Sequence, residues 1–205
     1  MLTSYNFEGK SKEEAINKCL EELKLTQQEI YIKESETEQK LFKAKKYLVS
    51  AFKKEDILKY IKAFLKELEL GLNISINSEV RYFEESINIV LVSDSNNVLI
   101  GKEGRTIDSI QILLRQSLNN LTGLNIKVNV DASNYKANKM KNLEYEIRKI
   151  AQDVLKNKVE VKLDPMNSYE RRIAHSVISE YPKLQTISYG EGLERHVVIS
   201  YKEAE

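Results

Sequence analysis

The chain has 205 residues, with 32 basic and 31 acidic side chains and a net charge of +1. This length suits one large domain or two to three small ones. The balanced charge argues against a protein that coats nucleic acid by bulk charge. Its one cysteine, Cys19, excludes an intrachain disulfide and a multi-cysteine zinc site, so we expect no metal and no cofactor.

The apolar runs of the sequence are short. The longest, IVLV at 89–92, is too short to span a bilayer, and the first residues lack the continuous apolar segment of a signal peptide. A single cysteine also fits a reducing compartment. These features predict a cytoplasmic protein that does not itself span a membrane.

The first stretch has the pattern of a small βαββ unit. Ser11 and Glu14 have capping-box spacing, and apolar residues then recur at helical intervals to about residue 24. Strand-like segments lie before this helix at SYNF and after it at EIYIKE and KYLVSAF. We expect a first domain over residues 1–53, followed by a polar joint, KKED at 53–56.

The second stretch has the predicted order αββααβ. An amphipathic stripe indicates a helix that ends at Gly71. Two strands follow, LNISINSEV and SINIVLV, joined by a polar turn around Glu84 and Glu85. A glycine-containing loop, a helix that stops near Gly123 and the strand NIKVNVD complete a domain over residues 56–133.

The third stretch, residues 134–205, is predicted to be αβαββ. A long charged helix reaches Lys156, VEVKL alternates as a strand, and SYERRIAHSVISEY is a second helix ended near Pro182. Two closing strands, LQTISY and RHVVISY, are linked by GEGLE. The fold class is therefore α+β, with three small domains. Even this last stretch has only 13 basic against 11 acidic residues, so function must lie in small sites.

The loop of the second domain, Gly101-Lys102-Glu103-Gly104, joins two short helical segments. Glycine permits positive φ and a close approach of the backbone. The intervening amide groups can then face a phosphate at the start of the next helix. A lone pair of glycines at this spacing is weak support, because most such pairs are plain turns.

The whole string VLIGKEGRTIDSIQILL resembles the signature of a KH domain, in the type II order of elements. This resemblance implies a site for single-stranded nucleic acid. The loop amides, Lys102 and Arg105 would hold the backbone, while Ile100 and Ile107 would contribute to the floor under the bases. Glu103 faces the same anion and weakens the site. The alternative is a KH domain used only for protein contact.

The helix of the third domain places Arg171 and His175 four residues apart, on one face. A guanidinium and an imidazole so placed can address a phosphate and a base together. On its own the pair favours the simpler interpretation, a solvated arginine and a histidine satisfied by neighbouring backbone. The span LDPMNSYERRIAHSVISEYPKLQTISYGEGLERHVVIS, however, resembles an R-three-H domain, a family associated with single-stranded nucleic acid. This resemblance implies that Arg171 and His175 contact the ligand.

Further basic residues are expected beside this pair. Arg172, Arg195 and His196 would extend the basic face of the third domain. For Arg195 there is an alternative, an ion pair across the hairpin with Glu191 or Glu194. These three residues are secondary expectations of the site.

A catalytic function is a weaker hypothesis. The two histidines of the chain could form the acid-base pair of a nuclease. However, the sequence has no recognisable nucleophile or metal-ligand spacing, and no Walker loop, dinucleotide fingerprint or nucleophile elbow. We therefore predict a binding protein and not an enzyme.

The three units together resemble the Jag family, also described as SpoIIIJ-associated proteins. The opening YNFEGKSKEEAINKCLEELKLTQQEI is similar to the Jag N-terminal domain, and DPMNSYERRIAHSVI to the core of the C-terminal one. There is one departure. The family carries a glycine-rich loop around a Leu-Phe pair, whereas QKLFKAKKYLVSAF keeps Leu41 and Phe42 but replaces the flanking glycines.

This resemblance implies an RNA-binding regulator of bacterial cell-envelope growth, cell wall biogenesis and cell shape. The expected partners are single-stranded RNA, or single-stranded DNA, and a small KH-domain protein or a second copy of the chain. A membrane insertase or cell-wall machinery would be contacted through the N-terminal domain, at the inner face of the membrane. The alternative is a protein-interaction scaffold with little RNA binding of its own. If both modules bind weakly, tethering them in one chain raises affinity.

Overall fold

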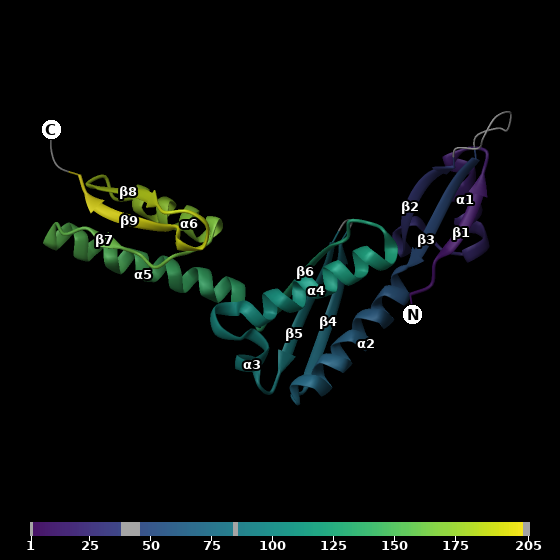
Figure 1. Ribbon diagram of the computed structural model, residues 1–205, viewed down its shortest axis with the longest axis horizontal. Coiled ribbons are helices and arrows are strands. Elements are labelled where there is room, and N and C mark those ends of the chain that lie inside the picture. Colours follow the sequence, from purple (N-terminus) through teal and green to yellow (C-terminus); the bar gives the residue numbers. More distant parts are fainter. Residues whose placement is uncertain (1, 38–45, 84–85, 203–205) are drawn as a thin grey trace. The chain divides into compact units, whose positions relative to one another are not determined.

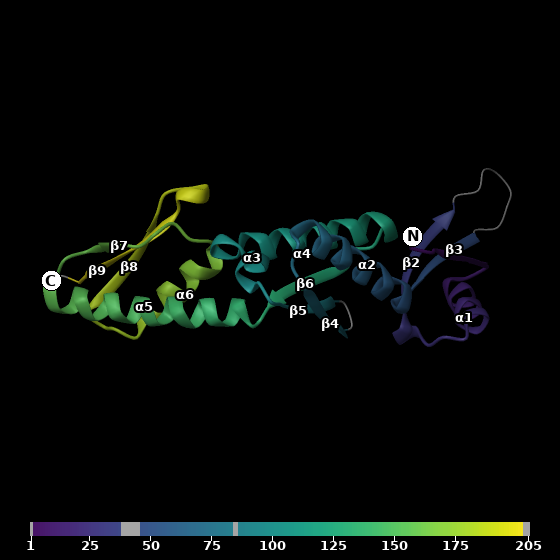
Figure 2. The same cartoon turned by 90° about the horizontal axis from the view of Figure 1, so that it is seen from below.

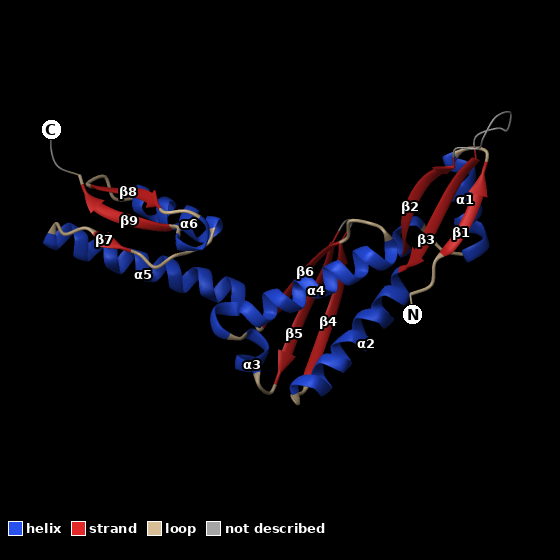
Figure 3. Cartoon of the chain, in the orientation of Figure 1, coloured by secondary structure: helices blue, strands red, loops and turns tan. Residues whose placement is uncertain are grey.

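The computed structural model describes residues 2–37, 46–83 and 86–202. Its fold is α+β, as predicted, and the described residues form three small sheets with helices packed on them (Figure 1 and Figure 3). The chain divides into two compact units, Met1–Ser133 and Asn134–Glu205. This break coincides with the predicted end of the second domain. The division of the first unit into two domains stays a prediction.

The first unit begins with a small sheet and one helix. Its elements are β1 (Tyr5–Gly9), α1 (Lys12–Leu23), a 3-10 turn (Gln27–Glu29), β2 (Ile30–Thr37) and β3 (Lys46–Lys53). β3 lies between β1 and β2, antiparallel to both. The helix begins where the capping pattern predicts, because the Ser11 hydroxyl accepts a hydrogen bond from the backbone N–H of Glu14 at 3.1 Å. The βαββ order is confirmed.

The predicted polar joint at 53–56 is wrong. β3 runs to Lys53, and α2 (Lys54–Leu72) begins at the next residue, so the strand passes directly into the helix. Lys53 is extended, with φ −68° and ψ 133°, as an N-cap residue must be. Glu55 and Asp56 occupy the first turn, where the helix dipole favours carboxylates. The polar residues therefore start a helix instead of forming a linker.

The end of α2 also differs from the prediction. Gly71 lies inside the last turn, and the helix ends at Asn73, which adopts the left-handed conformation with φ 52°. Asparagine tolerates this region better than most residues with a side chain. β4 (Ile76–Phe83) consequently starts later than the pattern LNISINSEV suggests, because the first residues of that segment finish and cap the helix.

The rest of the first unit has the element order of a type II KH domain. After α2 and β4 come β5 (Ser86–Ser93), α3 (Asn96–Ile100), α4 (Arg105–Thr122) and β6 (Lys127–Ala132). β5 lies in the middle of the sheet, antiparallel to β4 and parallel to β6. α4 ends at Gly123, with φ 65°. The predicted order αββααβ and the helix stop are confirmed.

A continuous apolar core supports the segment between α3 and α4. Alternate residues of β5 and β6 are buried, together with one face each of α2 and α4. Leu99 and Ile107, on either side of the glycine loop, have no exposed surface. The loop is therefore anchored in the core at both ends. The largest fully buried side chains of this part are Ile57, Ile61, Ile87, Ile89, Leu91, Leu99, Ile107, Leu114 and Leu118.

The second unit consists of two helices on one three-stranded antiparallel sheet. Its elements are α5 (Tyr135–Asn157), β7 (Val161–Lys162), α6 (Ser168–Ser179), β8 (Leu184–Tyr189), a 3-10 turn (Gly192–Glu194) and β9 (His196–Tyr201). β9 is central and pairs with both β7 and β8. Both helices pack on the same side of the sheet (Figure 2). The order αβαββ is confirmed, although β7 is shorter than the predicted VEVKL.

Alternation along β9 explains this packing. Val197 and Ile199 are fully buried, whereas His196 and Val198, which alternate with them, are only half-buried. The buried pair contacts a core to which the helices contribute, among others, Ile147, Ala151, Val154, Ala174 and Ile178. One face of the sheet is therefore core, and the opposite face carries no helix of this unit.

Two predictions concern residues outside the described ranges. These are the Leu41 and Phe42 pair, with its altered flanking residues, and the turn around Glu84 and Glu85. The strands on both sides of that turn are described, and β4 pairs with β5 in register from Ile76↔Ser93 to Phe83↔Ser86. The predicted pairing of these two strands is thus confirmed, while the turn between them lies outside the described residues.

Candidate nucleic-acid interface

The glycine loop is a tight connection between α3 and α4. Gly101 has φ 74°, Glu103 has φ 58° and Gly104 has φ 88°, so three of its four residues lie in a region that L side chains avoid. The backbone N–H of Gly101 donates to the carbonyl of Asn97 at 2.9 Å and ends α3. A Cβ atom at Gly101 would lie 2.1 Å from Oγ1 of Thr106. Glycine is therefore required here for both conformation and space.

The loop opens onto the positive end of a long helix. Gly104 is the N-cap of α4, and no side chain caps the helix there. The first turn of any helix has N–H groups without intrahelical partners, and the helix dipole adds partial positive charge. An anion, such as a phosphate, is the chemical group that fits this end.

The charges of the loop partly oppose one another. Lys102 is exposed. Arg105 forms an ion pair with Glu103 at 3.1 Å, and both side chains are largely in water, at 74% and 59% exposure. An incoming phosphate would compete with Glu103 for the Arg105 guanidinium. This ion pair was not predicted from the sequence.

The two residues predicted as a floor for bases differ in exposure. Ile100 is half-buried and keeps some surface, but Ile107 is fully buried. The expectation for Ile107 is thus corrected, because the side chain belongs to the core under the loop and has no surface for a base. Exposed apolar residues that the sequence reasoning missed lie on the two helices that flank the loop, namely Val98 on α3 and Ile112 and Leu113 on α4, which are 42%, 42% and 53% exposed. The sequence does contain a signal for these three residues, because they are apolar but lie outside the buried apolar stripe of their helices.

Arg171 of the second unit is held within its own domain. α6 begins with a capping box, in which the Asn167 side chain accepts from Glu170 N and the Glu170 carboxylate accepts from Asn167 N. The Arg171 guanidinium donates to the carbonyl of Met166 at 2.7 Å and to Ser168 Oγ at 3.3 Å. It therefore ties the helix start to the preceding chain.

His175 links α6 to the edge strand β8. Its Nδ1 lies 2.7 Å from Thr186 Oγ1, and its Nε2 lies 2.9 Å from Ser188 Oγ. Partial burial lowers the pKa of His175, and the nearby Arg171 guanidinium lowers it further. Arg171 and His175 do share one face of the helix, as predicted, but both have hydrogen-bond partners inside the domain. The geometry supports a bracing role for the pair.

The secondary basic residues are more accessible. Arg172 and Arg195 are exposed, and neither has an ion pair among the described residues. The alternative pairing of Arg195 with Glu191 or Glu194 is therefore not seen. His196 is half-buried, and its Nδ1 lies 2.9 Å from the carbonyl oxygen of Glu194.

The described part of the chain lacks two kinds of feature. In residues 2–37, 46–83 and 86–202, no three His, Cys, Asp or Glu side chains are grouped so that they could hold a metal ion. Within the same ranges, no helix combines the length and the apolar character needed to cross a membrane. The predicted loop residues, 101–105, lie in the first unit, and Arg171, Arg172, His175 and Arg195 lie in the second.

Known protein families match both units. The KH domain model matches residues 57–133, and the R-three-H domain model matches residues 140–201. The RNA-binding protein KhpB of Clostridium symbiosum is 34% identical over 199 residues, which cover 95% of this chain and 90% of that protein. The RNA-binding protein KhpB of Bacillus subtilis (strain 168) is 32% identical over 200 residues, or 95% and 96% of the two chains. The namesake in Lactiplantibacillus plantarum is 27% identical over 143 residues, 70% of this chain but 43% of that protein.

Proposed function

Because this chain belongs to the Jag family of KH and R-three-H domain proteins, which includes KhpB, we propose that it binds single-stranded RNA and catalyses no reaction. The observation that carries this proposal is the loop at 101–104. Its two glycines are required by the backbone, and it leads to an uncapped helix start. Both features suit a clamp for a sugar-phosphate backbone.

In this proposal the loop amides, Lys102 and Arg105 hold phosphates. Ile100, together with the exposed apolar residue Val98, contacts bases. The second module adds the accessible cations Arg172 and Arg195. His175 then acts mainly by holding α6 against β8 and Arg171 by holding the start of α6 to the preceding chain, so that both shape the binding surface. Two weak modules on one chain raise the effective concentration of the second contact.

Family membership extends the proposal to a biological setting. We propose a regulator in bacterial cell-envelope growth and cell shape, in the cytoplasm and recruited to the inner face of the membrane. Its protein partners would be another KH domain and, through residues 1–53, a membrane insertase or cell-wall machinery. Single-stranded DNA is a competing ligand of the same chemistry.

The second candidate function is a protein scaffold with little RNA affinity. Ile112 and Leu113 favour it, because they are exposed apolar neighbours on α4. A partner domain that packed on them would remove this apolar surface from water. A scaffold would keep its protein partner when Lys102 and Glu103 are changed. The altered scaffold would show no measurable loss of RNA affinity, because the unaltered scaffold binds RNA only weakly.

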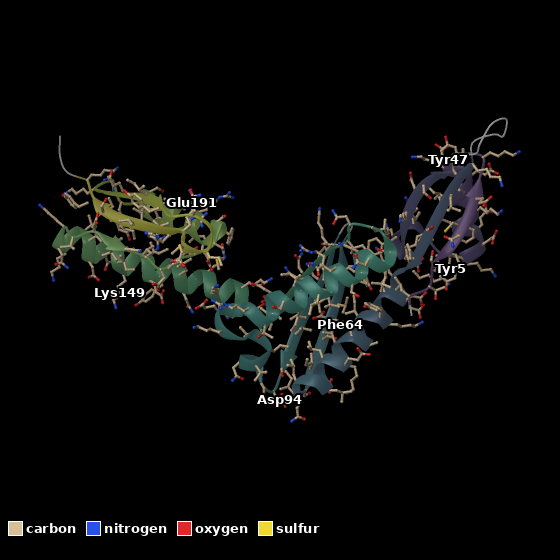
Figure 4. The ribbon with its side chains drawn as sticks, in the orientation of Figure 1. Tyr5, Tyr47, Phe64, Asp94, Lys149 and Glu191 are labelled. Atoms are coloured by element: carbon tan, nitrogen blue, oxygen red, sulfur yellow. The ribbon has the colours of Figure 1, made fainter. Side chains whose placement is uncertain are left out.

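The test is an anisotropy titration of fluorescein-labelled single-stranded RNA with the full chain. A Lys102→Asp, Glu103→Asp variant keeps both glycines and places acidic groups in the clamp. We expect it to lose most of the RNA affinity while its melting temperature is unchanged. The matched control carries the same two changes on α5, Lys149→Asp and Glu146→Asp, where Lys149 projects into solvent (Figure 4). If the unaltered chain does not bind RNA, the scaffold function takes its place.

A further inference from the structure

One face of the sheet in the second unit has no helix on it. α5 and α6 both pack on the other side (Figure 2). Strand register places Tyr189 opposite His196, and Ile187 opposite Val198, which is also opposite Lys162 of β7. We use the name open face for the surface made by Lys162, Gln185, Ile187, Tyr189, His196, Val198 and Ser200.

The open face is separate from the Arg171 and His175 pair. Side chains alternate along a strand, and Thr186 and Ser188 of β8 point to the helix side, where they contact His175. Ile187 and Tyr189 therefore point the other way. The two surfaces lie on opposite sides of the same edge strand.

Aromatic and apolar side chains are concentrated on and beside the open face. Tyr189 is 51% exposed, Ile187 is 47% exposed, and Leu193, in the turn just after β8, is 94% exposed. The rings of Tyr189 and His196 have centroids 6.4 Å apart and are tilted by 32°. Two neighbouring planar rings on a strand surface can each accept a nucleobase by stacking.

Cations lie at the edge and at one end of the open face. The backbone N–H of Lys202 donates to the carbonyl of Lys183 at 2.9 Å, which continues the β8 and β9 register beyond the strands. Alternation then places both lysines on the side of Gln185 and Ser200. Lys162 lies at the β7 edge, and all three lysines are exposed. None of them has an ion pair among the described residues.

Acidic residues lie toward both ends of the open face. Glu191, labelled in Figure 4, and Glu194 belong to the turn between β8 and β9, at the end away from Lys183 and Lys202. Glu160 precedes β7, and the β7–β9 register directs it toward Ser200 and the end with the two lysines. Along β8 and β9 the surface thus runs from Lys183 and Lys202 at one end to the rings of Tyr189 and His196 at the other, with Lys162 on the β7 edge between them. A single strand of nucleic acid presents the matching groups, phosphates beside planar bases. Protein interfaces, in contrast, are depleted in lysine.

We propose that the open face is a second RNA contact, in which bases stack on Tyr189 and His196 while Lys162, Lys183 and Lys202 hold phosphates. This inference rests on the proposed function and extends it to a surface distinct from the loop at 101–104. Gln185 and Ser200 provide hydrogen-bonding groups between the lysines and the rings. Because every base has a flat face, such a surface tolerates different sequences.

The first experiment measures binding of the full chain to fluorescein-labelled oligouridine by anisotropy. Tyr189→Leu keeps an apolar strand residue but removes the ring, and we expect affinity to fall on the order of tenfold, as loss of one stacked base predicts. Tyr189→Phe keeps the ring and should keep the affinity. The matched control is Tyr145→Leu, since Tyr145 lies on α5 and is 72% exposed.

The second experiment tests the cations and does not depend on a strand residue. A Lys183→Gln, Lys202→Gln variant should reduce the slope of log affinity against log salt by about two, or about one per phosphate contact. Ultraviolet crosslinking of the unaltered chain to thiouridine-substituted RNA should label the peptide that contains Tyr189 or His196.

The outcomes separate this inference from the proposed function. If the unaltered chain binds RNA and the loop variant loses binding, but Tyr189→Leu and the lysine variant do not change it, the open face is not an RNA contact and the proposed function stands. If the unaltered chain does not bind, both fail. Loss of affinity in Tyr189→Leu and in the lysine variant, with Tyr145→Leu unchanged, supports the inference.

Discussion

At the scale of single residues, the loop carries a charge conflict. Glu103 lies within the ion-pairing range of Arg105 and next to Lys102. Exposed ion pairs contribute little to stability, so we expect the Glu103–Arg105 pair to add little to the stability of the loop. In the proposed function, Glu103 would repel an approaching polyanion and partly neutralise Arg105.

We therefore expect Glu103→Gln to raise affinity for single-stranded RNA a few-fold at low salt and to leave the melting temperature unchanged. The reason is the loss of a negative charge at the phosphate position. Glu79→Gln is the matched control, because Glu79 forms a similar exposed pair with Arg81 at 2.8 Å on β4. Anisotropy titrations at two salt concentrations measure the effect. Equal affinities of Glu103→Gln and the unaltered chain would remove Glu103 from the site.

A second prediction for a single residue concerns the effect of His175 on the pH dependence of stability. Its folded-state pKa is lowered below the ordinary value of 6.5, so the unfolded chain binds the proton more tightly. The stability from neutral His175 is therefore complete above about pH 6.5 and decreases as pH falls from there toward the lower folded pKa. Urea unfolding of the second unit at several pH values should show this decrease.

Substitution of each histidine in turn tests this prediction. His175→Gln should remove that part of the pH dependence, while His196→Gln should retain it. Carboxylates with a lowered pKa, such as Glu180 beside Arg148, change the stability only at more acidic pH. They are present in the unaltered chain and in both histidine variants, so their contribution cancels in the comparison. A His175→Gln variant with the same pH profile as the unaltered chain would contradict the assignment.

At the scale of elements, the start of each functional helix depends on a different device. α6 has a capping box, and its Glu170 also pairs with Lys139 of α5 at 2.8 Å, mostly out of solvent. α4 has no side-chain cap and begins at two glycines. The first device stabilises a helix within its domain, whereas the second leaves the helix start without a side-chain cap, as the proposed phosphate clamp requires.

Two glycine substitutions test this difference. Gly101→Ala should destabilise the chain by more than about 1 kcal/mol, because positive φ and a clash combine, and it should also weaken RNA binding. Gly71→Ala is the control of opposite sign. Nothing lies within 4 Å of a Cβ there, and alanine in a helix is favoured over glycine by roughly 1 kcal/mol. Urea midpoints of the two variants give the comparison, and a stable Gly101→Ala chain with normal affinity would refute the role of the loop backbone.

At the scale of the whole molecule, the two compact units have separate cores. A unit with its own core can fold alone. We expect fragments 1–133 and 134–205 each to unfold cooperatively. We also expect each to bind RNA more weakly than the full chain, by on the order of a hundredfold or more if both contact one strand.

Calorimetry of the fragments and anisotropy with one RNA check these points. An equimolar mixture of the fragments is the control, since it has the same surfaces without the tether. If one fragment binds as tightly as the full chain, the other unit does not contribute to RNA affinity. The salt dependence of the full chain should be shallow, because few cations are available to replace counterions.

Local patterns were sufficient for the order of elements and failed at their ends. The capping pair Ser11 and Glu14 and the stop at Gly123 were read correctly, because each depends on neighbours in sequence. The joint at 53–56 and the helix end at Gly71 were misread. A polar run can be a linker or a first helical turn, and either Gly71 or Asn73 could have ended the helix, so the local sequence fits both boundaries in each case.

The sequence by itself determined the class α+β, the order of elements and the position of the glycine loop, because periodicity, capping and turn chemistry are local. Only the tertiary structure decided what the side chains face. Ile107 is buried because strands far away in sequence cover it. His175 is bound within its own domain because β8 supplies two hydroxyl groups to the imidazole, and Arg171 because the chain before α6 supplies the carbonyl of Met166. Tyr189 and Ile187 are exposed because both helices pack on the opposite side of the sheet, which no local pattern specifies.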